Sequence, residues 1–283
     1  MHTVVLGPLR LVNRVWRGAR KRVNLILKPW FAARPTEPRA REFLARMKSR
    51  WERGAKREVS YWRRCVAMKG SLAGHEKIQD RLDPSLPLQD YVTKVLDPKA
   101  TSVSILDVGA GPLTALGKKA PGYEIQITAV DALADDYDKI LRTHGVVPVV
   151  RTEACPTEGL LNRYRAEQFD IVHVRNALDH HYDVLLALQQ MLAVTKVGGL
   201  MILRHSANEA QHQGYLALHQ WNFCIEADDF LVWNHETRFS LKQQFGDSIE
   251  LVELDTQGGT KAHAVIRKLV SEVQGARVVE NAA

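Results

Sequence analysis

The sequence is poor in cysteine and has no long hydrophobic run. Its three cysteines, Cys65, Cys155 and Cys224, lie far apart and form no Cys-x-x-Cys pair, which argues against a metal–thiolate site or a disulfide framework and suits a reducing compartment. No apolar run reaches the roughly 18 residues of a membrane-spanning helix. The composition of the 283 residues, 45% hydrophobic and 25% charged, is that of one sizeable globular domain with an appendage.

Acidic residues are absent from the first 36 positions. Residues 1–58 hold 16 Lys/Arg against 4 Glu, a balance of +12, whereas the remainder holds 23 Lys/Arg against 28 Asp/Glu, a balance of −5. The basicity therefore belongs to an N-terminal appendage, whose first part we place at 1–38, and the main domain is net acidic. No nucleic-acid-binding motif accompanies the charge, so nucleic acid is not a predicted partner.

Between residues 6 and 31, Trp and Leu recur at near-helical spacing among arginines. This pattern is typical of helices that lie on an anionic membrane surface; a basic helix packed on its own domain and an Arg-rich targeting peptide are alternatives. The segment lacks the compact apolar core of a secretory signal. We therefore expect a cytoplasmic protein, with a peripheral position at the inner face of the membrane as a further possibility.

The most informative stretch surrounds Gly109-Ala110-Gly111. The apolar run at 103–108 predicts a buried parallel strand, and the two glycines predict a tight turn that a ligand can approach closely. A helix is predicted from Pro112, and a second strand at 125–130 ends in Asp131. Strand, glycine loop, helix, strand and acid, in this order, are typical of the nucleoside-binding half of a doubly wound fold, where the acid accepts from ribose hydroxyls.

The glycine pattern is incomplete for a dinucleotide, because Thr114 stands where the third glycine would be. Asp107 lies two residues before the first glycine, where a carboxylate suits a cationic ligand better than a pyrophosphate. The stretch resembles motif I of the class I S-adenosylmethionine-dependent methyltransferases, and Asp131 resembles the acid of their motif II. The resemblance implies an α/β fold with a doubly wound seven-stranded sheet, mostly parallel with its last strand antiparallel. It implies S-adenosylmethionine as cofactor, with contacts from Asp107, Gly109, Ala110, Gly111, Asp131 and Ala132.

The next segments continue the methyltransferase order. A helix is predicted to run to about Thr143 and a third strand to span 146–150. In the family, the loop after the third strand contacts the adenine, which implies that Cys155 and Glu158 lie near the base. A Pro-initiated helix N-terminus, with the acid favouring the helix dipole, explains Glu158 equally well.

The predicted fourth strand, 169–174, leads into a polar segment, 175–181. Ligands bind at the carboxyl ends of parallel strands, and the segment resembles motif IV of the small-molecule methyltransferases, which implies cofactor contacts from Arg175 and Asn176. His180 is the candidate general base, since a near-neutral imidazole can accept a hydroxyl proton. Its ring could be oriented by Asp179 or Asp183, and His181 is a further catalytic candidate. Asp179, His180 and His181 could also bind a metal, but adjacent residues rarely converge on one ion, so none is predicted.

Residues 206–248 are predicted to form an insertion with a hairpin made of 218–223 and 229–234. It lies between a fifth strand at 200–205 and a final antiparallel hairpin at 249–268. Over the strand ends, an insertion would build the acceptor pocket, and aromatic faces with His and Asn suit a sugar or polyol. A surface hairpin with Trp in its core is an equal alternative. The candidate substrate residues are His205, His219, Trp221 and Trp233.

The chain thus divides into residues 1–38, a helical cap at 39–98 over the glycine-rich edge of the sheet, a methyltransferase domain at 99–270 and a tail at 271–283. It also resembles bacterial methyltransferases associated with surface-polysaccharide synthesis, through 131–135, 175–180 and 219–223. This implies O-methylation of a small molecule, sugar or lipid-linked glycan. The absence of Asn-Pro-Pro-Tyr after the fourth strand disfavours amide N-methylation. An N-methyltransferase and a non-catalytic cofactor-binding scaffold or regulatory protein remain alternatives, whereas the glycine pattern disfavours a nicotinamide enzyme.

Overall fold

The computed structural model describes residues 37–68 and 78–271. The chain divides into two compact units, residues 1–42 and 43–283; of the first, only the start of one helix is described. The segment over 6–31 and residues 272–283 of the predicted tail lie outside the described residues. Within the described part, no helix is long and apolar enough to cross a bilayer.

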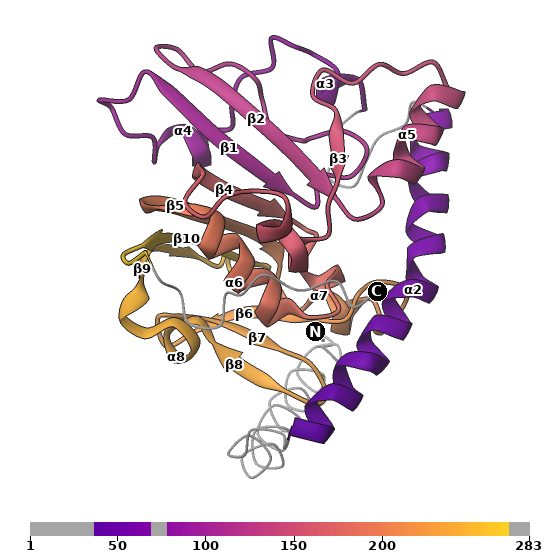
Figure 1. The fold of residues 1–283 in the computed structure, drawn as a ribbon, viewed down its shortest axis with the longest axis vertical. Coiled ribbons are helices and arrows are strands. Elements are labelled where there is room, and N and C mark those ends of the chain that lie inside the picture. Colours follow the sequence, from indigo (N-terminus) through magenta and orange to yellow (C-terminus); the bar gives the residue numbers. More distant parts are fainter. Residues whose placement is uncertain (1–36, 69–77, 272–283) are drawn as a thin grey trace, which may run out of the picture. The chain divides into compact units, whose positions relative to one another are not determined.

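Seven strands form one sheet in the order β3-β2-β1-β4-β5-β10-β9 (Figure 1). Their bounds are β1 Ser102–Val108, β2 Glu124–Asp131, β3 Thr152–Ala154, β4 Phe169–Arg175, β5 Thr195–Ser206, β9 Ile249–Asp255 and β10 Lys261–Lys268. Neighbours from β3 to β5 run parallel, whereas β10 runs antiparallel to both β5 and β9. The predicted seven-stranded sheet, with its last strand antiparallel, is confirmed.

Side chains of a strand point alternately to the two faces of a sheet, and both faces of this sheet are covered. Leu106 of β1 packs in the cluster that contains α6 (Val184–Val194), whereas its neighbour Ile105 packs with Val92 of α4 (Asp90–Thr93). Helices and loops on both faces explain why the central strands read as continuous apolar runs rather than as alternating ones.

The predicted helices are confirmed where their apolar pattern is long. Within the predicted helical cap, residues 39–68 lie in a long helix, α2, whereas residues 88–96 contain only the single turn of α4; α5 ends at Thr143, as predicted. The remaining helices are α2 Glu37–Met68, α3 Ile78–Arg81, α5 Ala134–Thr143, α7 Glu209–His212 and α8 Leu241–Phe245, with 3₁₀ turns η1 Thr157–Asn162, η2 Leu178–His180 and η3 Gly246–Ser248.

No helix follows the glycine loop: residues 109–123 are irregular, and the prediction of a helix from Pro112 is wrong. The side chain of Gln89 donates to the carbonyl of Ala115 (2.8 Å) and accepts from the N–H of Gly117 (3.1 Å). These bonds satisfy backbone groups that a helix would pair within itself. The segment is therefore held by the part of the chain that precedes β1.

The third strand is β3, at Thr152–Ala154, and the prediction of 146–150 is wrong. Residues 146–150 form a loop in which Val147 is 84% exposed. Pairing with β2 begins only where Thr152 meets Ala129. The run of valines has the composition of a strand, but residues 146–150 pair with no strand in the described part of the chain.

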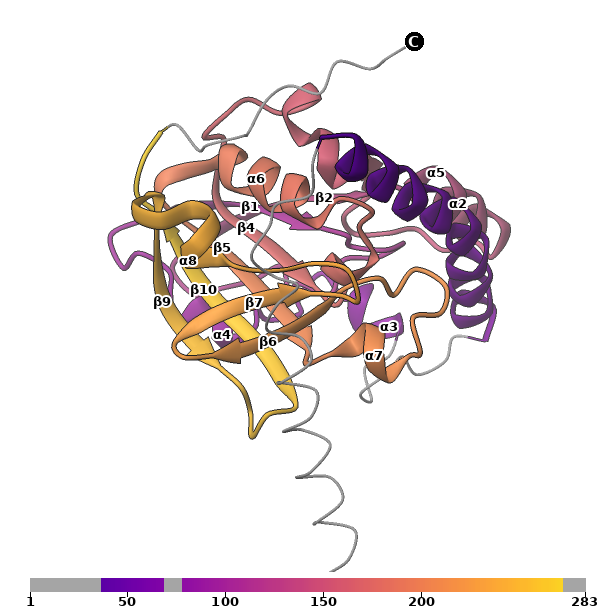
Figure 2. The same cartoon turned by 90° about the horizontal axis from the view of Figure 1, so that it is seen from below.

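The insertion, residues 206–248, contains a three-stranded antiparallel sheet in the order β6-β7-β8. Its strands are β6 Asn222–Glu226, β7 Asp229–Trp233 and β8 Arg238–Ser240. A hairpin is present, as predicted, and its second strand lies where expected, but its first strand is β6 at Asn222–Glu226 and not 218–223, and β8 is added to it. β6 contacts β10, and Figure 2 shows the insertion beside that edge of the main sheet.

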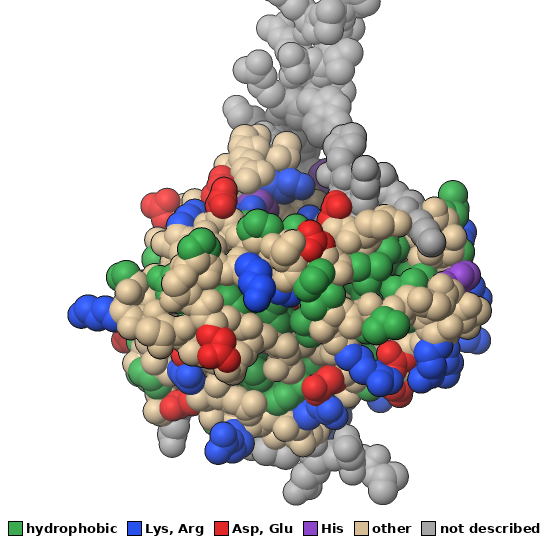
Figure 3. All heavy atoms as spheres, turned by 90° about the horizontal axis from the view of Figure 1, so that it is seen from above, with side chains coloured by type: hydrophobic (Ala, Val, Ile, Leu, Met, Phe, Trp, Pro, Cys, Tyr) green, Lys and Arg blue, Asp and Glu red, His purple; other side chains and the backbone are tan. Residues whose placement is uncertain are grey.

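Charged side chains of both signs are interspersed on the face shown in Figure 3, with hydrophobic side chains between them. Several pair with one another at the surface, such as Lys139 with Asp136 (2.8 Å). On that face, the described residues form no large patch of one sign.

Candidate active site

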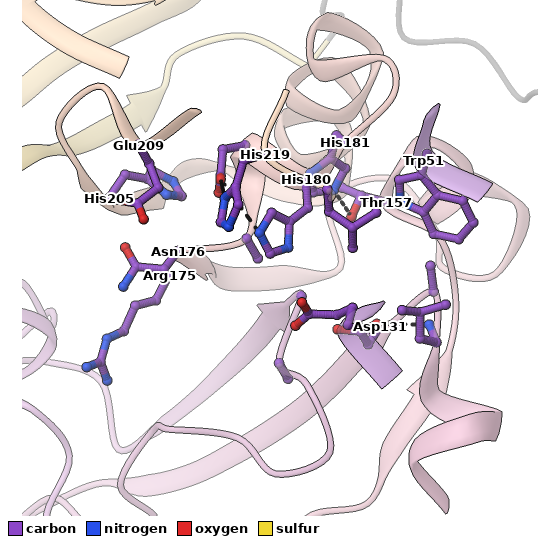
Figure 4. Close-up of a pocket in the computed structure, with 18 of the residues that line it drawn as sticks. Trp51, Asp131, Thr157, Arg175, Asn176, His180, His181, His205, Glu209 and His219 are labelled. Carbon is purple, nitrogen blue, oxygen red and sulfur yellow. Dashed lines mark hydrogen bonds and ion pairs between the residues drawn. The ribbon is translucent and has the colours of Figure 1, made fainter. Parts of the chain in front are cut away.

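A cavity of about 770 Å³ lies at the carboxyl ends of β1, β2, β4 and β5, where doubly wound sheets bind their ligands. Helix α2 and the insertion complete its wall. In Figure 4, Trp51 and Asp131 lie toward one end and His205 and Glu209 toward the other, with His180 between them. We refer to these as the Asp131 end and the His205 end.

The glycine loop requires glycine for two reasons. Gly109 and Gly111 have φ angles of +64° and +65°, in the left-handed region that favours glycine. A Cβ on Gly109 would lie 2.4 Å from the Cβ of Ala177, and one on Gly111 would lie 2.9 Å from the Trp62 ring. The loop is therefore packed tightly between the segment after β4 and helix α2.

Asp107 is buried beneath this loop, and both of its oxygens have partners. The Thr114 hydroxyl donates to Oδ2 (2.6 Å), and Oδ1 lies 2.7 Å from Nδ1 of His173. Nε2 of His173 is in turn 3.1 Å from the Tyr91 hydroxyl, and the Arg204 guanidinium lies over the Tyr91 ring. Asp107 thus ties the loop to β4 while it lines the floor of the cavity.

Asp131 ends β2 and faces the cavity. The N–H of Gly111 donates to its Oδ2 (3.1 Å) and the N–H of Leu133 to its Oδ1 (2.9 Å). Burial raises the pKa of Asp131 above its ordinary value, although these two N–H groups oppose the shift. Each oxygen keeps a lone pair, so the carboxylate can accept further hydrogen bonds from a ligand.

Three polar side chains meet near the middle of the cavity. Asp179 is buried, with Oδ2 lying 2.6 Å from Nδ1 of His219 and 3.6 Å from Nε2 of His180. The two imidazole rings are 4.8 Å apart, edge to face. Burial alone would raise the pKa of Asp179, but the charge of His180 and the hydrogen bond of His219 outweigh it and lower the pKa to about 2.

His181 points away from these three residues. Its Nδ1 lies 3.1 Å from the carbonyl of Leu178 and its Nε2 2.6 Å from the Thr157 hydroxyl, so both nitrogens are in use. The combination Asp179, His180 and His181 considered for a metal is therefore not brought together. Among the described residues, the group whose donor atoms lie close enough together to share a metal ion is Asp179, His180 and His219, with His219 in place of His181.

His205 is the most enclosed histidine at its end of the cavity. It is 1% exposed, packs on Phe223 at 4.7 Å between ring centroids, and neither ring nitrogen has a partner among the described residues. Burial lowers its pKa to about 3. A neutral imidazole with two unused nitrogens, next to Glu209 and Ser206 in the cavity wall, is suited to exchange hydrogen bonds with a polar ligand.

The predicted site residues divide clearly between wall and core. Eight of the ten predicted cofactor residues line the cavity, as do Asp179, His180, His181, His205 and His219. Gly111 lies behind Asp131, and Cys155 is buried with its thiol against the Pro156 carbonyl. Trp221 and Trp233 do not line the cavity; their indole N–H groups donate to the His181 carbonyl and the Asn208 side chain.

The sequence predicted a helical cap at 39–98 but no site residue within it, so the residues that α2 contributes were missed. Trp51, Glu58 and Trp62 line the cavity, and they recur at positions i, i+7 and i+11, which share one face of a helix. The pattern itself is visible in the sequence, but aromatic residues at helical spacing usually mark a core. Glu209 and Gln213 of the insertion also line the wall, and nothing in their local sequence distinguishes them.

Comparison with known proteins agrees with this geometry. Residues 106–203 match the family model described as a methyltransferase domain. Residues 106–203 form a methyltransferase domain. Its cofactor is S-adenosylmethionine. No curated protein matches the sequence.

Solved structures that this methyltransferase resembles are distant. A Clostridium acetobutylicum S-adenosylmethionine-dependent methyltransferase is 12% identical, with a TM-score of 0.37 over 63% of this chain and 95% of that one. A Methanosarcina mazei counterpart is 16% identical, with a TM-score of 0.36 over 65% and 100%. A chain in the complex of the Haloferax volcanii Trm112 methyltransferase activator with a proposed methyltransferase is 13% identical, with a TM-score of 0.45 over 61% of this chain and 85% of that one. At such values, the likenesses add nothing to the strand order described above.

Proposed function

We propose that this methyltransferase transfers the sulfonium methyl group of S-adenosylmethionine to a hydroxyl oxygen of a small polar acceptor. The observation that carries the proposal is the pairing of two imidazoles with one buried carboxylate, Asp179, in the cavity that the glycine loop opens into. Hydroxyl groups are weak nucleophiles until their proton is removed. An imidazole fixed beside a permanent anion supplies that function near neutral pH.

The residues at the Asp131 end fit the cofactor. Gly109 lines the cavity, where the close approach of Ala177 leaves no room for a Cβ, and Asp131 offers carboxylate lone pairs for ribose hydroxyls. Asn176 follows β4 with a φ of +48°, and its side chain accepts from the N–H of Ser206 (3.2 Å). Arg175 and Asn176 are the groups proposed for the amino-acid part of the cofactor, and Glu158 for the adenine side.

The reaction needs the two reactants in line more than it needs covalent chemistry from the protein. The acceptor oxygen attacks the methyl carbon, the carbon–sulfur bond breaks, and its electron pair stays on sulfur. The chain holds both partners in one cavity, which converts a bimolecular encounter into a positioned one. His180, the base predicted from the sequence, and His219 are the imidazoles next to Asp179.

A sugar or lipid-linked glycan is the acceptor class that we propose, in keeping with the resemblance to methyltransferases of surface-polysaccharide synthesis. The His205 end combines hydrogen-bonding groups of His205, Ser206 and Glu209 with the apolar faces of Phe223 and Leu218. Sugars present the same combination of hydroxyl groups and apolar ring faces. A membrane-linked acceptor would also give the basic segment at 6–31 a function as a surface anchor.

The test uses the full chain and S-adenosylmethionine with a deuterated methyl group. The acceptor panel contains methyl glycosides of common hexoses and 6-deoxyhexoses, the matching 2-amino sugars and short-chain polyprenyl-phosphate sugars. Mass spectrometry should find the labelled methyl on a hydroxyl oxygen of at least one compound. Label on the amino group would replace the proposal by N-methylation. Cofactor binding with no turnover of any compound would favour a non-catalytic scaffold.

The surface-anchor proposal has its own test. The full chain should float with vesicles that contain about one-third anionic phospholipid, whereas a chain starting at Thr36 should stay in the soluble fraction. Neutral vesicles are the control, because the attraction depends on the charge of the lipid. Equal flotation of the two chains would contradict the proposal.

A further inference from the structure

We infer that His219, which the insertion brings to the cavity, is the residue that takes the proton from the acceptor hydroxyl. The inference rests on the proposed function and identifies the base within it. The sequence favours His180, because it directly follows Asp179 in the polar segment after β4. The contacts of the folded chain favour His219, which lies 40 residues after Asp179.

Three hydrogen bonds attach the insertion to the segment after β4. Nδ1 of His219 lies 2.6 Å from Oδ2 of Asp179, and the N–H of Gln220 donates to the backbone carbonyl of Asp179 at 2.9 Å. The indole N–H of Trp221 donates to the carbonyl of His181 at 2.8 Å. Three consecutive residues are thereby aligned against 179–181, so the His219 imidazole is held by its own contact with Asp179 and by the two residues that follow it.

The other histidines of the cavity are less suited to accept a proton. His181 has both nitrogens in hydrogen bonds, and burial holds the pKa of His205 at about 3, which makes it a weak base. Nε2 of His180 is buried and 3.6 Å from Asp179, beyond hydrogen-bond distance. In His219, Nδ1 is held by Asp179, the side chain is 26% exposed, and Nε2 is the nitrogen left for the acceptor.

The charges around His219 favour its protonated form after the transfer. Asp179 is the nearest, and Glu209 and Glu58 add smaller attractions from the insertion and from α2. Burial lowers the pKa of His219, but the hydrogen bond and charge of Asp179 outweigh it and raise the pKa above the ordinary value. The His180 ring lies edge to face at 4.8 Å. A raised pKa makes the neutral imidazole a stronger base.

The transfer moves one proton to His219 and leaves one electron pair on sulfur. As the acceptor oxygen bonds to the methyl carbon, its hydrogen moves to Nε2 of His219, and the carbon–sulfur electron pair remains on S-adenosylhomocysteine. The imidazolium formed is neutralised by the carboxylate of Asp179 through the Nδ1–H hydrogen bond. Its proton returns to solvent after the product leaves, so no further reactant is needed.

A metal ion is the competing use of the same residues, because the donor atoms of Asp179, His180 and His219 all lie within 4.8 Å of one another. Ligands that share one zinc ion at about 2.0–2.2 Å stand roughly 3.3 Å apart. The separation of 2.6 Å between Asp179 and His219 is that of a hydrogen bond. The distances therefore favour a proton carrier over an ion.

The experiment measures kcat, KM and their pH dependence in the full chain, with the best acceptor of the panel described above. His219→Gln should lower kcat by about 100-fold or more, as loss of a general base does, without changing the affinity for S-adenosylmethionine measured by calorimetry. His180→Gln should cost less and keep the acidic limb of the pH profile. Asp179→Asn should move that limb to lower pH while lowering kcat, because it removes the charge that raises the His219 pKa.

Unchanged cofactor affinity also shows that each variant is folded, so a loss of kcat is not a loss of structure. The inference is overturned if His180→Gln abolishes turnover and the acidic limb while His219→Gln keeps both. It is equally overturned if a chelator abolishes turnover and Zn²⁺ or Co²⁺ restores it, because the cluster would then hold an ion. Absence of turnover in the wild-type chain would instead remove the proposed function, and the variants would not be needed to show it.

Discussion

The two ends of the cavity are built in different ways. At the Asp131 end, the glycine loop and the acid come from one short stretch of chain, in which backbone N–H groups are joined to a single carboxylate, and α2 adds Trp51 to the wall. The middle of the cavity and the His205 end come from segments far apart in the sequence, after β4, after β5 and in the insertion, and side chains join them. Backbone conformation therefore governs the first end, and side-chain pairing governs the second.

The largest effect expected at the Asp131 end follows Gly109→Ala. The left-handed φ costs about 1–2 kcal/mol for a residue with a Cβ, and the clash with Ala177 adds roughly 1–3 kcal/mol of overpacking. Thermal unfolding should show a loss of about 2–5 kcal/mol, and calorimetry should show loss of S-adenosylmethionine binding.

Gly122→Ala is the matched control. Gly122 also has a positive φ, +82°, but a Cβ there would meet nothing within 4 Å. It should cost only the backbone term of about 1–2 kcal/mol and leave cofactor affinity unchanged. If the two substitutions had equal effects on affinity, the packing of the loop against Ala177 would not matter for binding.

The second prediction concerns the carboxylate itself. Asp131→Asn keeps the shape of the side chain, but its amide nitrogen must face one of the N–H groups of Gly111 and Leu133. We expect S-adenosylmethionine to bind about 10- to 100-fold more weakly, since hydrogen bonds to charged groups contribute roughly 1.5–3 kcal/mol. Asp135→Asn, on the exposed side of α5, is the control. Full affinity in the first variant would mean that the ribose does not use this acid.

This contrast also explains what the sequence could predict. Gly109, Gly111 and Asp131 follow their strands directly, so the order of strand, loop and acid was enough to place them. The irregular segment after Gly111 was not predictable, because Gln89, more than 20 residues earlier, satisfies its backbone. β3 was misplaced because an exposed run of valines has the same composition as a buried one.

At the His205 end, residue types were predictable but partners were not. Asp179 or Asp183 was expected to orient His180. The fold pairs Asp179 with His219, a contact across 40 residues that no local pattern encodes, and Asp183 accepts from the N–H of Leu186 in α6. Trp221 and Trp233 resembled sugar platforms, yet their indole N–H groups bond to His181 and Asn208. Side-chain pairing between distant segments depends on how the insertion docks, which a single sequence does not reveal.

The third prediction tests the His205 end through pH. Because its folded pKa is about 3 and the unfolded value about 6.5, the unfolded chain binds this proton first, and stability falls as pH drops from 6.5 towards 3. Between pH 7 and pH 5, His205 lowers the free energy of unfolding by roughly 2 kcal/mol. Urea unfolding at the two pH values should show that His205→Phe removes this decrease.

His263 gives the experiment an internal reference, since burial lowers its pKa to about 4. It should leave a residual pH dependence of the same sign in His205→Phe. A profile that His205→Phe does not flatten would mean that His205 is already hydrogen-bonded and charged in the folded chain.

The smallest effect separates the two tryptophans. Trp221→Phe removes the hydrogen bond to the His181 carbonyl at a buried position and should cost about 0.5–1.5 kcal/mol. Trp233→Phe removes a longer bond of 3.2 Å to Asn208 at a half-buried position and should change stability by less than about 0.5 kcal/mol.

Neither residue lines the cavity, so Trp233→Phe should leave the acceptor KM within about twofold. Trp221→Phe should lower kcat instead, because it loosens the segment that holds His219. A rise in KM of about tenfold in Trp233→Phe, with kcat unchanged, would show that the acceptor reaches beyond the cavity wall to β7, and the acceptor site would then extend along the insertion.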